Sequence, residues 1–203
     1  MFPEIKIHCE KLTTQFHLIS EERKELLVKT ATFISSKRKE NNSVQLLFVC
    51  THNSRRSQFG QVWAAVAAHY YKIEPVFTFS GGTETTAFNQ NAITALDTLG
   101  FNISKKTATT NPIYEVDFGA ENPVICFSKV FDDKANPSTD FAAIMTCADA
   151  EENCPFIPGA KLRIATTYDD PKVFDGTPIV AEKYLERSNQ IALEMLFVFS
   201  LVD

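Results

Sequence analysis

A short apolar run, VQLLFV at residues 44–49, ends in a cysteine, and a polar loop and a helical pattern follow it directly. Uncharged apolar runs of this length are typical of buried strands. From Phe59 to Tyr70, apolar residues recur every three or four positions, which predicts a helix with one buried face. A strand, a loop and a helix in this order indicate a parallel sheet, with Cys50 at the end of a strand.

The rest of the chain repeats this alternation of strand and helix. Strand patterns lie at residues 75–80, 141–146 and 161–166, and helical patterns lie at residues 86–99 and 178–199. The alternation predicts βαβ units around a mostly parallel sheet, whose ligands bind beyond the carboxyl ends of the strands. Cys50 and Cys147 each follow a predicted strand, so we expect them on the same edge of the sheet.

Two segments add to this core. Residues 1–43 are predicted to be an N-terminal helical extension, in which Ser20 caps an amphipathic helix over residues 20–39. We expect this helix to pack on the outer layer of the sheet or to contact a second copy of the chain. Residues 44–203 form the main domain, and residues 111–140 are an insertion in it, where IYEVDF and PVICFS flank GAEN as a hairpin.

The composition excludes several classes of partner. The 203 residues include 20 Lys and Arg against 25 Asp and Glu, which gives a net charge of −5 and argues against nucleic acid or an anionic membrane as partner. No apolar run is long enough to span a membrane, and the N-terminus has no secretion signal, so we expect a cytoplasmic protein. In that compartment the five cysteines are more often buried or reactive than disulfide-bonded.

The loop that starts at Cys50 has the form C-x5-R-S. Successive backbone amides of such a loop, together with the N-terminus of the next helix, can surround a tetrahedral oxyanion. Arg56 can bind two of the anion's oxygens, and the same positive field favours a thiolate at Cys50. The predicted oxyanion-binding residues are Thr51, His52, Asn53, Ser54, Arg55, Arg56 and Ser57.

Cys147 and Cys154 form a C-x6-C pair after a predicted strand. A zinc site would need a second pair of ligands that the sequence does not show, so we expect no metal. A nucleophilic Cys50 favours a redox role for the pair over two unrelated cysteines, because thiol–disulfide exchange needs an attacking and a resolving thiol. Asp170, before Pro171, is either a general acid or base or a turn residue, and the spacing alone favours the turn.

Together these motifs resemble the low-molecular-weight protein tyrosine phosphatases and, more closely, the thioredoxin-coupled arsenate reductases built on that fold. The similarity covers roughly residues 44–110 and 141–200 and rests on CTHNSRRSQ, FSGGTET, ITALDTLGFNIS, MTCADAEENCP and DDP. It implies an α/β fold, a three-layer sandwich with a central four-stranded, mostly parallel sheet, to which residues 1–43 add the N-terminal helical extension.

The resemblance implies a reaction as well. Cys50 attacks arsenate, Arg56 binds its oxygens, and Asp170 assists the departing hydroxyl. Cys147 attacks the adduct, so that arsenite leaves and a Cys50–Cys147 disulfide forms. Cys154 then produces a Cys147–Cys154 disulfide, which thioredoxin reduces. The resemblance implies no bound cofactor, with thioredoxin as the external reductant and arsenate or a phosphate-like oxyanion as substrate. We expect a monomer or weak dimer.

Two loop positions depart from the family pattern. His52 stands where relatives have glycine, so its ring either crowds the site or donates to the anion. Arg55 stands where a small residue is usual, and we expect a solvated neighbour rather than a contributor of positive charge to the site. The positions that match the potassium site of some relatives lack both acidic ligands, so no potassium site is expected; they are Asn53, Gln61, Ser80, Thr107 and Thr109.

Two other functions remain open. A low-molecular-weight protein tyrosine phosphatase would use Cys50, Arg56 and Asp170 through a phosphocysteine intermediate, without the cysteine pair. A non-catalytic anion- or metal-binding redox sensor would bind its ligand without turnover. The remaining cysteines have structural interpretations: Cys126 is predicted in a buried strand, and Cys9 at the surface or in helix packing.

Overall fold

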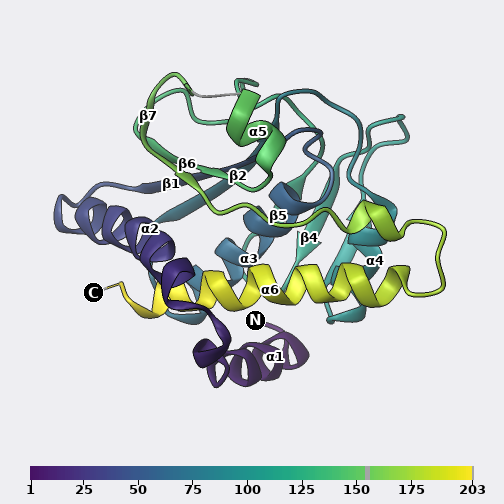
Figure 1. The fold of residues 1–203 in the computed structure, drawn as a ribbon, viewed down its shortest axis with the longest axis horizontal. Helices are drawn as coiled ribbons and strands as arrows, with labels where there is room; N and C mark the ends of the chain where they lie inside the picture. The colour runs from purple at the N-terminus through teal and green to yellow at the C-terminus, as the bar shows by residue number, and fades with distance from the viewer. Residues whose placement is uncertain (154–155, 203) are drawn as a thin grey trace.

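The computed structural model describes residues 1–153 and 156–202, and a sheet of four parallel strands lies at its centre (Figure 1). The strand order is β2 (Val76–Gly82), β1 (Val44–Cys50), β6 (Phe141–Met145) and β7 (Ala160–Ala165). Each neighbouring pair of strands is parallel. β1 and β6 are buried along almost their whole length, which explains their uninterrupted apolar sequences. The predicted α/β fold around a four-stranded parallel sheet is confirmed.

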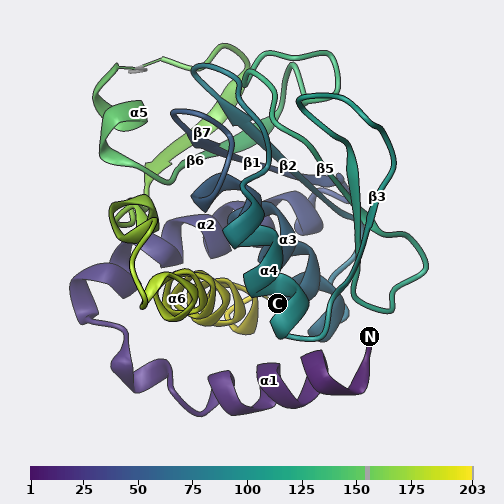
Figure 2. The ribbon, with the colours of Figure 1, turned by 90° about the vertical axis from the view of Figure 1, so that its right-hand side faces the viewer.

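The sheet is the middle layer of three (Figure 2). On one face α3 (Arg56–Tyr70) packs against β1 and β2, and α6 (Val180–Ser200) packs against α3. α4 (Gln90–Thr98) lies beside α6. On the opposite side the short helix α5 (Ala148–Asn153) contacts β1 and β6. The carboxyl ends of β1 and β6 therefore meet between α3 and α5.

The helix predicted over residues 86–99 begins later than expected. α4 starts at Gln90 because Asn89 caps it, with its side-chain oxygen accepting from the amides of Asn91 and Ala92 at 2.9 and 3.3 Å. The amide of Thr86 instead donates to the hydroxyl of Ser128 at 2.9 Å. The predicted start at residue 86 is therefore wrong, because a contact from far along the chain holds residues 86–89 in an extended connection.

A second, antiparallel sheet contains β3 (Asn102–Lys105), β4 (Tyr114–Asp117) and β5 (Val124–Cys126). β4 and β5 form the predicted hairpin, and Cys126 is fully buried in it. β3 was not predicted, because it has one apolar residue among polar ones and most of it is exposed. Its place is decided by pairing with β4 rather than by its own sequence.

The N-terminal segment folds into α1 (Pro3–Thr13), a 3-10 turn η1 (Phe16–Leu18) and α2 (Glu21–Lys39). Ser20 caps α2 as predicted, accepting from the amide of Arg23 at 3.3 Å. α2 contacts α6, β1 and the edge strand β7, and α1 lies along α6 (Figure 1). Cys9 of α1 is fully buried, which fits the helix-packing alternative rather than the surface one.

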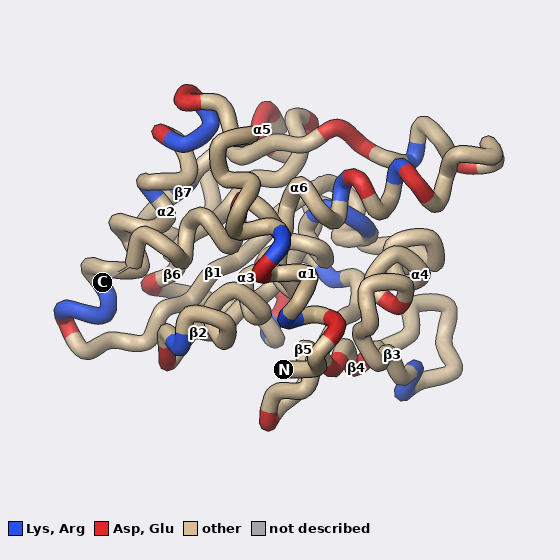
Figure 3. Tube along the Cα trace, turned by 90° about the horizontal axis from the view of Figure 1, so that it is seen from below, with Lys and Arg blue, Asp and Glu red and all other residues tan. Residues whose placement is uncertain are grey.

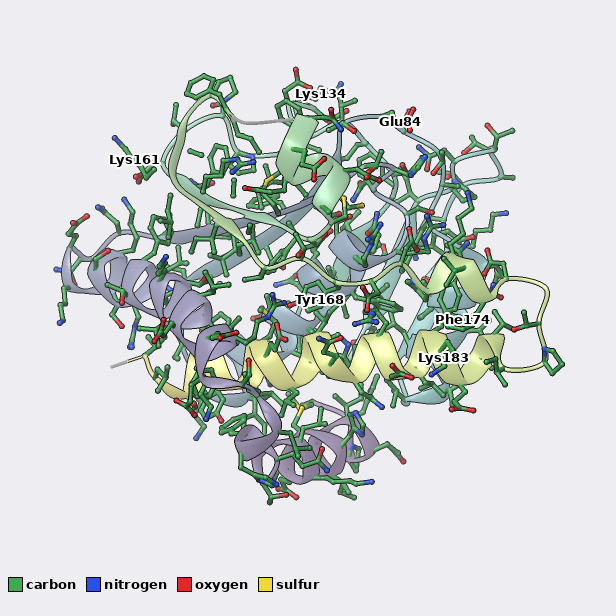
Figure 4. All side chains as sticks on the ribbon, viewed as in Figure 1. Glu84, Lys134, Lys161, Tyr168, Phe174 and Lys183 are labelled. Carbon is green, nitrogen blue, oxygen red and sulfur yellow. The ribbon has the colours of Figure 1, made fainter. Side chains whose placement is uncertain are left out.

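A buried polar cluster joins α2 to α6. Arg23 donates three hydrogen bonds of 2.8–3.0 Å to the carboxylate of Glu194, and the hydroxyl of Tyr168 donates to the same carboxylate at 2.7 Å. The guanidinium of Arg23 also lies over the Tyr168 ring, 4.7 Å from its centroid. Figure 4 shows Tyr168 between the sheet and α6. The N-terminal segment therefore fixes a residue that, as described below, contacts the candidate site.

We expect Arg23→Met to lower the free energy of unfolding by about 3 kcal/mol, because it leaves the Glu194 carboxylate buried without its counter-charge. The Glu194 side chain is only 4% exposed. Lys24→Met is the matched control, since Lys24 pairs with a Glu21 side chain that is 85% exposed. It should change stability by no more than about 0.5 kcal/mol. Urea unfolding at pH 7 measures both, and equal losses in the two variants would contradict the assignment.

Charges of both signs are distributed over the molecule. Figure 3 shows Lys and Arg interleaved with Asp and Glu along the chain rather than gathered on one side. Among the described residues, no helix is long and apolar enough to cross a membrane.

Candidate functional site

The loop that follows β1 places Cys50 beside two polar side chains. The sulfur of Cys50 lies 3.1 Å from the hydroxyl oxygen of Ser57, at the start of α3. That oxygen accepts a hydrogen bond from the Asn53 side-chain amide at 2.8 Å. The Ser57 hydroxyl proton is therefore available to the Cys50 sulfur, and it would stabilise a thiolate there.

The loop backbone is arranged as an anion cradle. Its carbonyls are bonded outward: those of Cys50 and Thr51 accept from amides of residues 83 and 84, and that of His52 accepts from the Ser128 hydroxyl. Within the described residues, no backbone amide of residues 51–55 donates to another protein atom. Asn53 has a φ of +47°, which turns the backbone into a left-handed bend. A bend with unpaired successive amides is an anion-binding nest.

Neighbouring segments hold this loop in shape. The Asn53 side-chain oxygen accepts from the backbone amide of Lys129 at 2.9 Å, and the Gln58 side chain donates to the carbonyls of Asn53 and Phe127, both at 3.0 Å. Gly82 passes close behind, where a Cβ would lie 2.6 Å from the Thr51 carbonyl oxygen. Part of the predicted insertion, residues 127–129, is thus a support for the loop.

Arg56 leaves one donor unused. Its Nη1 donates to the Tyr168 carbonyl at 2.8 Å, and its Nη2 donates to Asp170 at 2.7 Å. Its Nε is buried and has no hydrogen-bond partner among the described residues. The side chain is 9% exposed, so an unpaired donor here would carry a free-energy cost that a bound oxyanion removes.

Arg55 is not the solvated neighbour that the sequence suggested. Its side chain is 8% exposed, and its Nε and Nη2 lie 2.8 and 3.1 Å from the two carboxylate oxygens of Asp170. Asp170 therefore contacts two guanidinium groups. The expectation was wrong because the charge of Asp170, 115 positions away, draws Arg55 inward.

Of its two predicted alternatives, Asp170 takes the role of a turn residue, and its carboxylate also lies beside the anion loop. Its Oδ1 accepts from the amide of Lys172 at 3.0 Å and so caps a 3-10 turn, η2 (Pro171–Phe174). Burial would raise its pKa, but Arg56, the Lys172 amide and Arg55 oppose this, and the net effect lowers the pKa. Asp170 is thus a carboxylate at neutral pH.

Cys147 lies at the same sheet edge as Cys50, as expected from the strand ends. Its sulfur is 3.4 Å from the Thr51 hydroxyl and also accepts from the amide of Ala150 at 3.4 Å. Cys147 is fully buried in an apolar cluster that includes Cys50. Both described cysteines of the site are free thiols. Cys154, the predicted resolving cysteine, lies outside the described residues.

Other predicted residues have different partners. The His52 ring lies 2.9 Å from the carboxylate of Glu84, which is at the surface, so His52 pairs with that carboxylate. The Ser54 hydroxyl donates to a carbonyl at 2.6 Å. Of the positions matched to a potassium site, the Ser80 hydroxyl donates to Gln61 at 2.6 Å, while Thr107 and Thr109 bond backbone groups beside β4.

A cavity of about 360 Å³ opens beside the loop, between α5, the segment 167–170 and α6. Its lining includes Arg56, Asp149, Tyr168, Asp170 and Arg187. The carbonyl of Tyr168 and the 127–129 support were not predicted as parts of the site. No local signal marks them, since each acts through backbone groups and lies 69 to 112 positions from its partner in the loop.

Lys129 gives a stability prediction from its burial. Its ammonium lies 4.4 Å from the Phe127 ring centroid, and burial lowers its pKa from 10.5 to about 8. At pH 7 Lys129 is charged in both states, so the folded state bears the cost of burying the charge. We expect Lys129→Met to be more stable by about 3 kcal/mol at pH 7. The gap should close between pH 8 and 10.5, because over this range Lys129 is deprotonated in the folded state and still protonated in the unfolded state.

Urea unfolding of the wild type and Lys129→Met at pH 7 and pH 10 tests this. Lys134→Met, at an exposed lysine of the same segment, is the control and should show no pH-dependent gap. If Lys129→Met differs from the wild type in the free energy of unfolding by the same amount at both pH values, the stabilisation comes from side-chain packing and not from removal of a buried charge.

Comparisons with known proteins agree with this geometry. No model of a known protein family matches the sequence. An arsenate reductase of Halalkalibacterium halodurans is 27% identical over 136 residues, 67% of this chain and 80% of that protein. An arsenate reductase of Bacillus subtilis is 28% identical over 132 residues, 65% of this chain and 77% of that protein.

Solved structures show the same architecture. A low-molecular-weight phosphotyrosine phosphatase of Vibrio cholerae superposes with a TM-score of 0.52 at 13% identity, covering 77% of this chain and 95% of that one. An arsenate reductase in a phosphate-binding state gives 0.52 at 16% identity, covering 79% and 99%. The chain is therefore a homologue of proteins named arsenate reductase, and it has the fold of the low-molecular-weight tyrosine phosphatases.

Proposed function

We propose that this protein is an enzyme that reduces arsenate to arsenite, with Cys50 as nucleophile, Cys147 as the second thiol and thioredoxin as the external reductant. The observation that carries the proposal is the loop after Cys50: its amides are unpaired, the Arg56 Nε is buried without a partner, and Cys147 lies beside it. Homology to arsenate reductases supports the choice of oxyanion.

The first step is attack on bound arsenate. The Cys50 thiolate forms a sulfur–arsenic bond, and one arsenic–oxygen bond breaks. The departing oxygen leaves as water, with the two protons that dihydrogen arsenate brings, so atoms and charge balance without an external acid. Ser57 stabilises the thiolate and Arg56 holds the anion's oxygens. The Asp170 carboxylate accepts a hydrogen bond from the departing hydroxyl and orients it.

The second step is the reduction. The Cys147 thiolate attacks the Cys50 sulfur, a disulfide forms, and the sulfur–arsenic bond breaks with its electron pair staying on arsenic. Arsenic(V) becomes arsenic(III), which takes up protons and leaves as arsenite, while two thiols are oxidised. The Thr51 hydroxyl beside Cys147 can donate to its thiolate. Cys154 then attacks the Cys147 sulfur and releases Cys50, and thioredoxin in the cytoplasm reduces the final disulfide.

Phosphatase activity on aryl phosphates is the second candidate, because the same cradle accepts a phosphoryl group and a solved neighbour is a phosphotyrosine phosphatase. This reaction needs a proton for the departing aryl oxide, and Asp170 is held as a carboxylate by two arginines. We therefore rank it below arsenate reduction.

Steady-state arsenate reduction with thioredoxin, thioredoxin reductase and NADPH tests the proposal. The wild type should turn over, and Cys154→Ser should stop after a single turnover. Cys9→Ala, which removes a buried thiol far from the loop, should behave as wild type. If neither wild type nor Cys154→Ser reduces arsenate while both hydrolyse an aryl phosphate equally, the phosphatase function replaces the reductase.

A further inference from the structure

Two guanidinium groups bind one carboxylate at the mouth of the anion loop. Arg55 approaches both oxygens of Asp170, at 2.8 and 3.1 Å, and Arg56 donates to Oδ2 at 2.7 Å. The amide of Lys172 donates to Oδ1 at 3.0 Å. Oδ2 thus accepts from both guanidinium groups and Oδ1 accepts from the Lys172 amide, while the buried Arg55 Nε lies near Oδ1 without donating to it. The Asp170 side chain is 25% exposed.

This arrangement opposes protonation of Asp170. A carboxylic acid has one hydroxyl, whose proton would point at an N–H donor whichever oxygen carried it. Arg56 contacts only Oδ2, whereas the Arg55 guanidinium donates to Oδ2 and lies 2.8 Å from Oδ1, so Arg55 adds a second positive charge beside both oxygens. Because Arg55 belongs to the loop and Asp170 to the segment after β7, Arg55 also fixes the position of Asp170 over the loop.

We propose that Arg55 determines the specificity of this site: by placing a second guanidinium group against the Asp170 carboxylate, it prevents that residue from donating a proton and so favours inorganic oxyanions over phosphate monoesters. The inference deepens the proposed function and rests on Cys50 acting as the nucleophile there. Arg55 is a positioning residue, since it acts through Asp170.

The two reactions differ in where the leaving group finds its proton. When Cys50 attacks an aryl phosphate dianion, a sulfur–phosphorus bond forms, the phosphorus–oxygen bond breaks, and the aryl oxide leaves without a proton. It needs an acid, and the only carboxyl contacting Arg56 among the described residues is Asp170. Dihydrogen arsenate supplies both protons of the water that leaves. A site without a proton donor therefore retains the arsenate step and slows the ester step.

Other charged side chains line the cavities beside Asp170 without forming an ion pair with it. From α6 these are Lys183, Glu186 and Arg187, from the segment before η2 it is Asp169, and across the cavity from α5 it is Asp149. Arg187 lies 3.5 Å from Asp169 and Lys183 pairs with Glu186 at 2.6 Å. The four charges on α6 and Asp169 thus pair with one another, whereas Arg55 contacts Asp170 itself.

The test is the pH profile of kcat/KM for para-nitrophenyl phosphate. In Arg55→Ala the alkaline limb, where Asp170 loses its proton, should move up by about one pH unit, since an arginine partner lowers an aspartate pKa by about one unit or more. Hydrolysis at pH 7 should rise about tenfold, because each unit changes the protonated fraction tenfold. Arg55→Lys keeps one positive charge but loses the planar guanidinium group that contacts Asp170. The alkaline limb of its pH profile should therefore lie between those of the wild type and Arg55→Ala.

Lys183→Ala is the matched control for loss of a nearby positive charge. Lys183 lies next to η2, with its ammonium 5.5 Å from the Phe174 ring centroid (Figure 4), and it does not contact Asp170. Its limb should coincide with that of the wild type. If Arg55→Ala fails to fold, as judged by circular dichroism, the Arg55→Lys profile carries the test.

The outcomes separate this inference from the proposed function. An alkaline limb that stays in place in both Arg55 variants overturns the inference, even if the wild type reduces arsenate. A limb that moves while no variant reduces arsenate supports the role of Arg55 toward Asp170 and removes the reductase. The third outcome combines two results: the alkaline limb moves, and Arg55→Ala reduces arsenate in a single turnover no faster than the wild type does. This outcome supports both the role of Arg55 and the proposed arsenate reduction.

Discussion

Cys50→Ser is expected to lose arsenate reduction by a factor of about 10⁴ or more, as removal of a catalytic nucleophile does in other enzymes. The loop can stabilise a thiolate, through the Ser57 hydroxyl 3.1 Å away. Among the described residues no imidazole or carboxylate contacts the Cys50 sulfur to act as a base for a serine, since the His52 ring pairs with Glu84. The anion cradle is made of backbone amides and Arg56, so Cys50→Ser should still bind phosphate with an affinity within about threefold of wild type. Calorimetric titration with phosphate, run beside the activity assay, measures both.

Cys126→Ala is the matched control for Cys50→Ser. Cys126 is a fully buried thiol whose pKa burial raises to about 12, so it is not ionised at neutral pH. It should leave arsenate reduction within about twofold of wild type, since it contributes packing rather than chemistry. Retention of arsenate reduction in Cys50→Ser, or loss of phosphate binding together with activity, would show that the loop does not work as described.

Cys147→Ser is expected to separate the two chemistries of the site. Arsenite release should fall by about 10³-fold or more. Without the Cys147 thiol, no thiolate at this position can attack the Cys50 sulfur and break its bond to arsenic. Aryl phosphate hydrolysis should stay within about threefold of wild type, since it needs Cys50 and Arg56 but no disulfide. The Thr51 hydroxyl, 3.4 Å from the Cys147 sulfur, can bond a serine in the same place, so the loop should keep its shape.

Measuring arsenite and para-nitrophenol on the same preparation of Cys147→Ser checks this prediction. Parallel loss of both activities would mean that Cys147 supports the loop rather than carrying electrons. Equal arsenite release in wild type and Cys147→Ser would remove the cysteine relay.

The nucleophile loop could be predicted from the sequence because its signals are local. The strand before Cys50, the polar loop and α3 lie within one stretch of chain, where an apolar run is followed by apolar residues every three or four positions. The predicted single buried face of α3 is wrong, because the helix is buried around most of its surface. The edge shared by Cys50 and Cys147 followed from the ends of two predicted strands, because parallel strands end on the same side.

The rest of the site depends on contacts between distant segments, which spacing does not encode. Arg55 was expected in solvent, yet Asp170 draws it inward. Asn53 accepts from the backbone amide of Lys129, and Arg56 donates to the backbone carbonyl of Tyr168. Every residue type has these carbonyl groups and nearly every one has the amide, so the sequence gives no sign of which ones support the loop. β3 was missed for a related reason, since its pairing with β4 outweighs its polar composition.

The central claim is that arsenic is reduced by the protein's own thiols at the Cys50 loop. The most direct measurement is a single turnover: pre-reduced protein, freed of external thiol, is mixed with arsenate, and arsenite and free thiols are counted. We expect one arsenite per wild-type protein and the loss of two thiols, with no arsenite from Cys50→Ser. Unchanged thiols and no arsenite from a folded wild type that binds arsenate would contradict it.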